Sequence, residues 1–359
     1  MPHSRLDGPI DPVCGKAAAP THNLVRRRSG YSLEEFNGDK NEVRSFRVIF
    51  MPSKNTQKRY QLIKHGSEFR LELQGEADIR DPGPHDVVIR VRATSINRRD
   101  IMIWRGAYPI GDRVSVVPLS DGAGEVVAVG DAVTRIKVGD RVVGQFFQKW
   151  LHGRALASTG ESALGGARNG MLSEYVTLHE EGVLPFPEHL SFEEAATLPC
   201  AALTAWNGLV TRGGLGRGDF VLLQGTGGVS IFGLQFAVAL QATAIITSSS
   251  ALKLSRAREL GATHLINYRD TPEWAPVVLA ATGGVGAHHV LEVGGVGTLA
   301  QSLASLAHGG HIAIIGGLAG FGGEIPAANM IGRSTNVSGI FVGSRSEFEV
   351  MNPSFISIA

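Results

Sequence analysis

The sequence predicts an α/β protein with two folded parts, a small β-barrel followed by a doubly wound parallel sheet. At 359 residues the chain is long enough for two domains. Its 46 glycines suit a fold with many tight turns. Short strand-like segments dominate residues 58–200, whereas strand-like and helix-like segments alternate over residues 201–345.

The barrel is predicted from short segments that alternate apolar and polar residues between glycine and aspartate turns. Residues 86–93 (DVVIRVRA) have the period of two that a strand with one buried face requires. Residues 124–130 form another short strand between glycines, and residues 137–144 form a turn that leads into a third. Several such strands are typical of a small closed sheet.

The parallel sheet is predicted from buried strands that alternate with helices. Strands are expected at residues 220–224, 244–247, 264–268, 289–293 and 311–316, and helices at residues 231–240 and 252–260. Because a helix between two strands returns the chain to the same edge, these strands should run parallel with helices on both faces of the sheet.

Residues 1–57 mix proline, glycine, asparagine and charged residues without periodicity. They are therefore expected to be a disordered extension or loop. They contain no apolar segment of the kind that marks a secretion signal. Three successive arginines at residues 26–28 leave organelle import as a less favoured alternative to the cytoplasm.

Composition favours a small-molecule substrate over a large charged partner. A formal net charge of +1 gives no strong attraction to nucleic acid or membrane. The two cysteines, Cys14 and Cys200, suit a reducing compartment, so a cytoplasmic location is expected. Residues 220–251 carry no charge and could span a bilayer by length, but their glycines favour a buried strand, a loop and a helix.

A glycine-rich loop lies between the first strand and the first helix of the predicted sheet. It consists of Gly225, Thr226, Gly227, Gly228, Val229 and Ser230. In such a loop the first glycine permits a tight turn and the second lets backbone N–H groups approach a pyrophosphate at the helix N-terminus. Ser230 replaces the third glycine of the usual pattern. The segment is predicted to be a Rossmann dinucleotide-binding site, with a plain βα turn as the alternative.

The choice of cofactor is predicted from the residues that follow this loop. NAD enzymes usually have an acidic residue about 20 positions on, which binds the ribose 2′-hydroxyl. Residues 220–258 contain no acidic residue, and the second strand is followed by Ser248, Ser249 and, in the next helix, Lys253. Hydroxyl groups and a cation suit a 2′-phosphate, so the cofactor is predicted to be NADPH. A solvated charge on the helix surface is the alternative role for Lys253.

Several ordered motifs between residues 60 and 352 resemble the medium-chain dehydrogenase/reductase superfamily. The motifs are residues 95–100 (SINRRD), 122–126 (GAGEV), 138–142 (VGDRV), 198–206 (LPCAALTAW), the glycine loop, 261–268 (GATHLINY) and 339–345 (GIFVGSR). The sequence is most similar to the zinc-free quinone oxidoreductase and enoyl reductase-like branch of this alcohol dehydrogenase-like superfamily. The resemblance implies a GroES-like barrel, a Rossmann domain and an active site in the cleft between them.

The resemblance also implies further contacts to the cofactor. Lys253 and Tyr268 match positions near the 2′-phosphate of NADPH. Other positions that the resemblance assigns to cofactor binding are Thr204, Val293, Gly316, Phe341 and Val342.

The same comparison predicts that the chain holds no metal. Catalytic zinc needs about three protein ligands. Zinc alcohol dehydrogenases have cysteine at the position of Asn97 and a His-Glu pair at Ser120 and Asp121, so that only Cys200 matches a ligand. Residues 147–175 contain no cysteine, so the structural zinc lobe of those enzymes is not expected either. Cys200 is interpreted as a small buried residue.

Without a Lewis acid, reduction of a quinone, an enone or another activated double bond is favoured over alcohol oxidation. Tyr108 matches a catalytic tyrosine of similar enoyl reductases and is the candidate hydrogen-bond donor, although an aromatic pocket wall is an equal alternative. Asn97 is a candidate for orienting substrate or nicotinamide, or for capping a turn. The alternative functions are an NAD(P)-dependent alcohol or aldehyde oxidoreductase and a non-catalytic NADPH-binding protein.

The ends of the chain depart from the family pattern. Members usually begin near the position of Tyr60 and return to the barrel after the Rossmann domain. Residues 346–359 are therefore expected to be a truncated tail. The missing return is expected to leave an unpaired barrel edge and apolar surface, and a homodimer is expected only with a complete C-terminus.

Overall fold

The computed structural model describes residues 25–26, 31–35, 46–50, 56–66, 68–320, 322 and 327–356. The chain divides into two compact units, Met1–Asn55 and Thr56–Ala359. In the first unit, β1 (Val25–Arg26), β2 (Tyr31–Glu35) and β3 (Phe46–Phe50) form an antiparallel sheet. No regular structure was predicted for residues 1–57, so these strands correct that prediction where they occur. Aromatic and β-branched residues such as Val48 and Ile49 explain the third strand.

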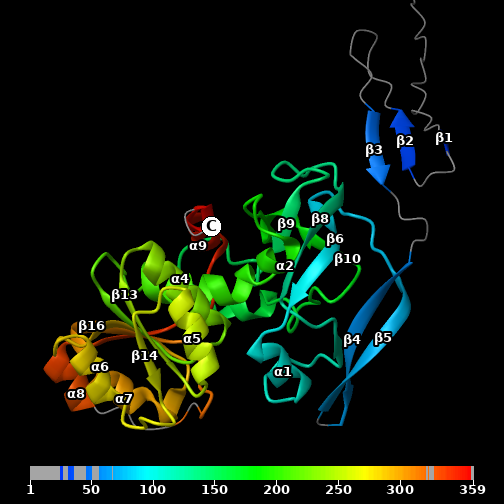
Figure 1. The fold of residues 1–359 in the computed structure, drawn as a ribbon. Coiled ribbons are helices and arrows are strands. Elements are labelled where there is room, and N and C mark those ends of the chain that lie inside the picture. The colour runs from blue at the N-terminus through cyan, green and yellow to red at the C-terminus, as the bar shows by residue number, and fades with distance from the viewer. Residues whose placement is uncertain are drawn as a thin grey trace, which may run out of the picture. The chain divides into compact units, whose positions relative to one another are not determined.

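The second unit begins with an antiparallel β part (Figure 1). One sheet has the order β10-β6-β8-β9-β11, and a second has the order β5-β4-β7. The bounds are β4 Thr56–His65, β5 Glu68–Asp78, β6 Asp86–Ser95, β7 Ser115–Val116, β8 Asp121–Val129, β9 Arg141–Gly144, β10 Tyr175–His179 and β11 Val183–Pro185. Helix α1 (Arg98–Trp104) follows β6 and α2 (Phe192–Ala195) follows β11. The three strands predicted between residues 86 and 144 are confirmed.

A six-stranded parallel sheet follows, with the order β14-β13-β12-β15-β16-β17. Its strands are β12 Phe220–Leu223, β13 Thr243–Ser248, β14 His264–Asn267, β15 Ala287–Glu292, β16 Leu306–Ile314 and β17 Asn336–Gly339. The helices are α3 Leu203–Trp206, α4 Gly228–Ala239, α5 Ala251–Glu259, α6 Ala275–Ala281, α7 Leu299–Ala304, α8 Ala327–Arg333 and α9 Arg345–Met351. The five predicted strands are confirmed. The short edge strand β17 was not predicted.

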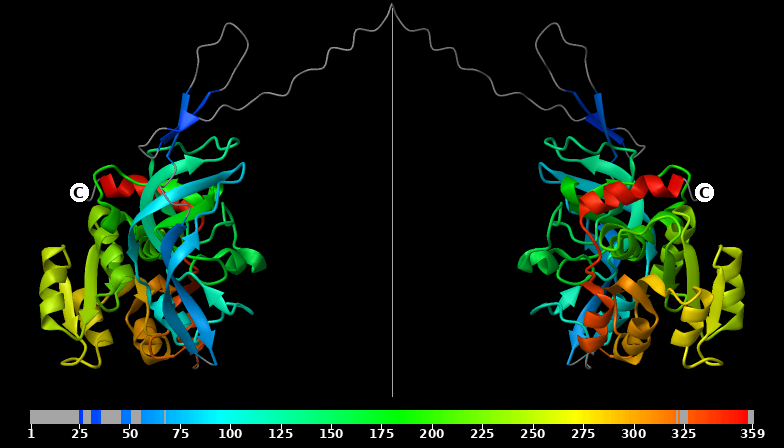
Figure 2. Two further views of the ribbon diagram at one scale, coloured as in Figure 1. Left: turned by 90° about the vertical axis from the view of Figure 1, so that its right-hand side faces the viewer. Right: turned by 90° about the vertical axis from the view of Figure 1, so that its left-hand side faces the viewer.

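Helices cover both faces of this sheet (Figure 2). Successive residues of a strand point to opposite faces, and the core divides accordingly. Leu223 packs with Leu234 of α4 and Leu254 of α5 in one hydrophobic cluster. The preceding Leu222 packs with Val278 of α6 in a second cluster. The uncharged segment 220–251 therefore forms two strands of the sheet and a helix that covers one of its faces. In the part of the chain that the structure describes, no helix is long and apolar enough to cross a bilayer.

The β part and the parallel sheet share one hydrophobic core. The cluster that contains Leu223 also contains Val143 of β9, Phe147 and Leu203. A continuous helical segment, residues 198–211, connects the two parts. The predicted boundary at residue 200 lies inside this helical segment, so no flexible linker separates the parts there.

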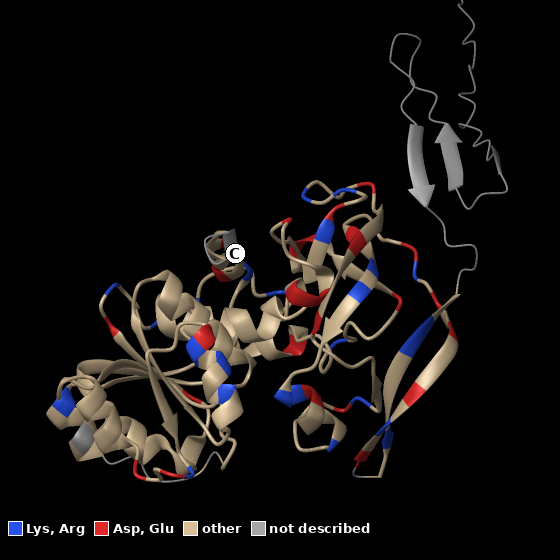
Figure 3. Ribbon diagram, in the orientation of Figure 1, with Lys and Arg blue, Asp and Glu red and all other residues tan. Residues whose placement is uncertain are grey.

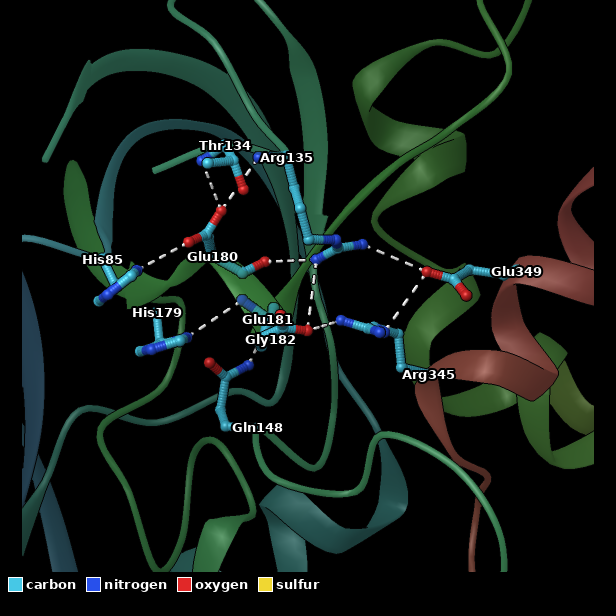
Figure 4. A network of polar contacts seen from close by, with 10 residues as sticks. All are labelled: His85, Thr134, Arg135, Gln148, His179, Glu180, Glu181, Gly182, Arg345 and Glu349. Carbon is cyan, nitrogen blue, oxygen red and sulfur yellow. Dashed lines mark hydrogen bonds and ion pairs between the residues drawn. The ribbon is translucent and has the colours of Figure 1, made fainter. Parts of the chain in front are cut away.

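After β17 the chain returns to the β part, where ion pairs hold α9 (Figure 4). Arg345, the first residue of α9, pairs with Glu181, which lies just before β11. Arg135 binds the carbonyl of Glu180 at 2.8 Å and the carboxylate of Glu349 at 3.2 Å. Because Arg345 also lies 3.4 Å from Glu349, the four charged groups form a network rather than isolated surface pairs.

Candidate cofactor and active site

The predicted cofactor residues lie at one edge of the parallel sheet. In the sheet order β12 is central, with β13 on one side and β15 on the other. The strand order reverses at β12, and such a point leaves a crevice at the carboxyl ends of the strands. The glycine loop follows β12, Val293 follows β15, and Phe341 follows β17 within two residues. Tertiary structure thus brings together segments that are more than 100 residues apart.

The glycine loop has the backbone geometry that a bound pyrophosphate requires. Gly225 has φ +69°, a left-handed conformation that favours glycine. Gly227 is the N-cap of α4, so the free N–H groups of the first helical turn begin here. A Cβ added to either glycine would meet no atom within 4 Å. The space over the loop is therefore open to a ligand, and Gly225 is required by its φ angle rather than by crowding.

Hydrogen bonds hold this loop against the end of β13. Ser230 Oγ donates to the carbonyl of Gln224 at 2.6 Å, which explains how serine replaces the third glycine of the motif. The Gly225 N–H donates to Thr247 Oγ1 at 3.1 Å, and the hydroxyls of Thr226 and Ser248 lie 3.4 Å apart. Hydrogen bonds thus connect the glycine loop directly to the predicted 2′-phosphate site.

The residues predicted to bind the 2′-phosphate gather beyond β13. Ser248 is buried, and its carbonyl accepts a hydrogen bond from the N–H of Tyr268 at 3.1 Å. Ser250 caps α5 by accepting from the N–H of Lys253, whose side chain is exposed. Ser249 lies between them and is half-buried. No Lys, Arg, Asp or Glu occurs from residue 220 to residue 252, so Lys253 is the first charge after the loop (Figure 3).

A buried carboxylate, Glu292, lies beneath the crevice. The side chain is fully buried, and five groups donate to it: Gln224 Nε2 (2.7 Å), Ser302 Oγ (2.5 Å), Thr298 Oγ1 (2.5 Å) and the N–H groups of Gly294 (2.8 Å) and Gly295 (3.0 Å). None of these partners is a cation. Gln224 immediately precedes the glycine loop, so Glu292 fixes that loop against the segment that follows β15.

The segments predicted to face the nicotinamide lie beside this network. The N–H of Val293 donates to Gln224 Oε1 at 3.2 Å. A Cβ added to Gly316 would lie 3.4 Å from the carbonyl oxygen of Val293, so these two predicted residues are neighbours. Phe341 is 44 % exposed, and its ring lies 4.5 Å from that of Phe147.

Val342 has an unusual backbone conformation at this edge. Its φ angle is +52°, which is unfavourable for a β-branched residue. Its carbonyl accepts from Asn207 Nδ2 at 2.7 Å, and the carbonyl of Gly343 accepts from Gln145 Nε2 at 3.1 Å. Two buried amides, one from each part of the unit, therefore hold the strained segment in place.

Thr204 is buried in α3 and is the one predicted cofactor residue that precedes the glycine loop in the sequence. Its hydroxyl interacts with the thiol of Cys200 one turn earlier. That helical segment approaches the loop at Ala201, whose Cβ would lie 3.4 Å from a Cβ placed on Gly228. Thr204 thus belongs to the helix under the loop.

Asn97 and Asp121 belong to a buried polar cluster at the N-terminal end of this helical segment, beside Cys200. Asp121 is fully buried; its carboxylate accepts from Ser120 Oγ at 2.7 Å and from the Cys200 N–H at 3.1 Å. Burial raises the pKa of the Asp121 carboxyl to about 7, although Asn97 and Ser120 lower it. Burial, with the nearby Asp121, also raises the pKa of the Cys200 thiol well above its usual value. The cluster therefore holds protons near neutral pH.

Asn97 also begins helix α1. Its N–H donates to Asp100 Oδ2 at 2.7 Å, whereas its side-chain Nδ2 is buried without a hydrogen-bond partner among the described residues. The backbone bond is the one that the alternative capping role requires, and the role of the side chain in orienting a ligand stays a prediction.

Tyr108 follows α1 and is half-buried. The guanidinium carbon of Arg99 lies 5.1 Å from its ring and 4.8 Å from the ring of Phe146, and Arg99 donates to the carbonyl of Leu164 at 2.8 Å. Arg99 is thus a packing residue between two aromatic rings.

The residues at the zinc-ligand positions do not fit a catalytic zinc ion. Three protein ligands are needed, and at the positions that match zinc ligands Cys200 and Asp121 are the only strong donors. Ser120 Oγ and the Cys200 N–H each donate to one oxygen of the Asp121 carboxylate. Over residues 56–66, 68–320 and the other described segments, no group of three or more His, Cys, Asp or Glu side chains could hold a metal ion.

Comparison with known families identifies the class of protein. Residues 83–188 match the alcohol dehydrogenase GroES-like domain. Residues 228–356 match the family described as zinc-binding dehydrogenase. Together with the barrel and the Rossmann sheet, these matches define a medium-chain, nicotinamide dinucleotide-dependent oxidoreductase.

The chain belongs to the alcohol dehydrogenase-like branch of the medium-chain dehydrogenase/reductase superfamily. It is 48% identical over 274 residues to a zinc-type alcohol dehydrogenase-like protein of Schizosaccharomyces pombe, covering 75% of this chain and 79% of that relative. A putative alcohol dehydrogenase of Sinorhizobium meliloti 1021 has a TM-score of 0.80 and 42% identity over 85% of this chain and 89% of its own. A quinone oxidoreductase of Pseudomonas syringae pv. Tomato DC3000 has a TM-score of 0.69 and 30% identity over 84% of this chain and 87% of its own.

The residues that hold the glycine loop and the neighbouring segments in place through hydrogen bonds were not predicted from the sequence. Glu292 and Gln224 were recognised only as parts of strands, and Thr247 only as part of a strand end. An acidic residue directly after the apolar pair Val290–Leu291 of a predicted strand was a usable signal for Glu292, because a buried carboxylate requires several hydrogen-bond donors. The roles of Asn207 and Gln145 left no signal in the sequence, since both depend on the strained segment at Val342.

Proposed function

We propose that the chain is an NADPH-dependent oxidoreductase that transfers hydride to a quinone, an enone or another activated double bond without zinc. One observation carries the choice of cofactor. The end of β13 hydrogen-bonds to the glycine loop and presents hydroxyl groups, the following helix α5 carries Lys253, and residues 220–258 contain no carboxylate. A carboxylate there would repel a 2′-phosphate, whereas serine hydroxyls and a lysine bind it.

The arrangement of residues suggests how each would contribute. Bound NADPH supplies the hydride. The glycine loop and the N-terminus of α4 would hold its pyrophosphate, and Lys253 with Tyr268 would hold the adenosine 2′-phosphate. The Tyr108 hydroxyl would donate a hydrogen bond to the carbonyl oxygen of the acceptor, where negative charge develops. The second hydrogen added to the double bond is a proton from the protein or solvent.

The zinc-independent chemistry is supported by the cluster around Asp121. Oxidation of a simple alcohol requires a group that stabilises the alkoxide, usually a metal ion. This chain has two strong donors at the ligand positions where three are needed. The likeness to a quinone oxidoreductase, at 30% identity, supports the same class of acceptor.

A second candidate is an NAD(P)-dependent alcohol or aldehyde oxidoreductase. It is favoured by the relative in Schizosaccharomyces pombe, which is described as zinc-type alcohol dehydrogenase-like and is 48% identical. A zinc-dependent alcohol oxidation should be abolished by chelation, whereas the proposed reduction should continue in the presence of a chelator.

The test is an absorbance assay of cofactor oxidation with 1,2-naphthoquinone and 2-cyclohexenone as acceptors, each with NADPH or NADH. The expected result is turnover with NADPH, a lower KM for NADPH than for NADH, and no loss on treatment with EDTA. Tighter binding of NADH would refute the cofactor assignment. NADPH binding without turnover of any acceptor would instead favour a non-catalytic NADPH-binding protein.

A further inference from the structure

The segment that contains the strained residue Val342 is fixed at both ends. It comprises residues 340–346 and runs from the end of β17 into α9. Its first N–H donates to the carbonyl of Ile314, the last residue of β16, at 2.9 Å. At the other end, the N–H groups of residues 345 and 346 donate to the carbonyls of residues 150 and 151, each at 2.9 Å. The parallel sheet therefore holds one end of the segment, and the β part holds the other.

Two buried amides supply the hydrogen bonds in the middle of this segment. Asn207 Nδ2 donates to the carbonyl of Val342 at 2.7 Å. Gln145 Nε2 donates to the carbonyl of Gly343 at 3.1 Å. In the part of the chain that the structure describes, residues 341–343 form no other hydrogen bond. The oxygens of both amides are buried without a partner among the same residues, so each amide serves this segment alone at the cost of an unpaired buried oxygen.

The backbone of Val342 requires such support. Its φ angle of +52° is unfavourable for a β-branched residue, and such a conformation persists only where the surroundings impose it. A Cβ added to Gly343 would lie 2.8 Å from Leu203 Cγ, so Gly343 packs directly on the helical segment 198–211 and has little room to move. Ile340 is fixed by its hydrogen bond to β16. Without the two amides, the rotation that relaxes Val342 would therefore displace Phe341, which lies between these fixed points.

Phe341 and Val342 are the residues of this segment that are predicted to contact the cofactor. The ring of Phe341 packs on that of Phe147 and remains partly exposed. The two amides, in contrast, are almost completely buried: Asn207 is 2 % exposed and Gln145 is 1 % exposed. Because neither amide reaches the surface of the crevice, its effect on a bound cofactor must pass through the segment that it holds.

We propose that Gln145 and Asn207 are positioning residues for the nicotinamide end of the bound cofactor. They hold Val342 in its left-handed conformation and thereby fix Phe341 and Val342 where the nicotinamide binds. The inference rests on the proposed function, because it takes these two residues as contacts of the cofactor. Gln145 directly follows β9, and Asn207 lies in the helical segment that joins the β part to the parallel sheet. The nicotinamide end of the site therefore depends on residues from outside the parallel sheet.

The test uses the double variant Gln145→Met with Asn207→Leu. These replacements keep the side-chain volumes nearly constant, and they remove both donors together with both unpaired oxygens. Isothermal titration calorimetry of the full chain compares NADPH with 2′,5′-ADP, a fragment that lacks the nicotinamide. The Kd for NADPH should rise about tenfold, which corresponds to about 1.4 kcal/mol. This is the size of the penalty for one left-handed residue that is no longer held.

The Kd for 2′,5′-ADP should change by less than about twofold, because this fragment ends before it reaches the segment. An equal change for both ligands would indicate a general structural defect and would refute a positioning role, as would an unchanged Kd for NADPH. If the double variant does not fold, each single variant is expected to weaken NADPH selectively by about threefold. Absence of a selective loss in both single variants would then refute the inference.

A rescue experiment tests whether the amides act through the conformation of Val342. Glycine adopts positive φ angles about as readily as negative ones, so a glycine at this position needs less support. In a Val342→Gly background, the double variant should therefore raise the Kd for NADPH by less than about threefold. A loss of about tenfold in that background would show that the amides do not act through the strained residue.

Gln57→Met is the matched control for the loss of a buried amide. Gln57 is 7 % exposed, and its side chain accepts from Ser173 and from the N–H of Tyr175, both in the β part. The control should change the Kd values for NADPH and 2′,5′-ADP by less than about twofold. A selective loss of NADPH binding in Gln57→Met as large as in the double variant would refute the assignment to Gln145 and Asn207.

Binding also separates this inference from the proposed function. If no acceptor is reduced, the proposed reaction fails, and the comparison of NADPH with 2′,5′-ADP still tests the two amides. If the wild-type chain binds NADH and not NADPH, the proposed cofactor fails, and NADH is compared with ADP-ribose under the same criteria. Binding of neither dinucleotide would refute both.

Discussion

A buried histidine should make the fold sensitive to acid. His311 lies in β16 and is 5 % exposed. Among the described residues, neither of its ring nitrogens has a hydrogen-bond partner. Burial, and then the nearby His289, lowers the pKa of His311 to about 4. His289 itself lies 3.2 Å from the carboxylate of Asp219, with His288 beside it, so no acidic group directly compensates a charge on His311.

The sign and size of the effect follow from linkage. In the unfolded chain the pKa of a histidine is about 6.5. Between that value and 4, the unfolded state binds a proton that the folded state lacks, so the free energy of unfolding falls as the pH falls. A pKa that is lower by 2.5 in the folded state corresponds to a maximum loss of about 3.4 kcal/mol in the free energy of unfolding. Roughly 2.5 kcal/mol of this should be lost by pH 4.5.

The perturbation is His311→Leu, which removes the titration and two unsatisfied ring nitrogens at similar volume. Its free energy of unfolding should equal or exceed that of the wild type at pH 7 by up to about 2 kcal/mol. Urea unfolding followed by circular dichroism measures the free energy of unfolding of the wild type and of the variant at pH 7 and at pH 4.5. His308→Leu, at an exposed position of the same strand, is the control. If wild type and His311→Leu lose equal free energy between the two pH values, the assignment to His311 is wrong.

Three further variants test the proposed site. Lys253→Glu should raise the KM for NADPH by about 30-fold and the KM for NADH by less than threefold, because it places a carboxylate beside the 2′-phosphate; equal effects would contradict the role of Lys253. Tyr108→Phe should reduce the kcat for 2-cyclohexenone by about 10- to 100-fold and leave the Kd for NADPH unchanged; an unchanged kcat would assign the hydrogen bond to another donor. Glu292→Gln should destabilise the fold by about 3 kcal/mol and weaken NADPH about tenfold in calorimetry, with less than a twofold effect on 2′,5′-ADP; an equal loss for both ligands would indicate a general structural defect.

The parallel sheet was predictable because its central strands are buried on both faces. Residues 220–223 (FVLL) are apolar throughout, and residues 244–246 (AII) form the apolar centre of the neighbouring strand, as expected for strands buried on both faces. The edge strand β17 was missed because residues 336–339 include one large apolar side chain and are partly exposed. Its pairing with β16 comes from tertiary structure rather than from local pattern.

The cofactor residues could be predicted for a related reason. In a parallel sheet all carboxyl ends lie at one edge, so residues that directly follow strands become neighbours whatever their spacing in the chain. Gly225, Val293 and Gly316 are such residues, and the structure places them as that rule requires. The supporting network of Glu292 could not be predicted, because Thr298 and Ser302 reach it from helix-forming positions whose orientation the sequence does not specify.

Membership of the zinc-binding dehydrogenase family does not by itself imply a catalytic metal ion in this chain. The match to the zinc-binding dehydrogenase family covers residues 228–356, which are residues of the Rossmann sheet and its helices. The zinc-ligand positions of the resemblance, Asn97, Ser120–Asp121 and Cys200, all lie outside that range. The match therefore depends on residues that hold a dinucleotide, and it is independent of the residues that would hold a metal. Dinucleotide binding follows from the Rossmann half of the molecule, whereas the chemistry of the acceptor must be argued from the buried Asp121 cluster, where this chain's own residues decide it.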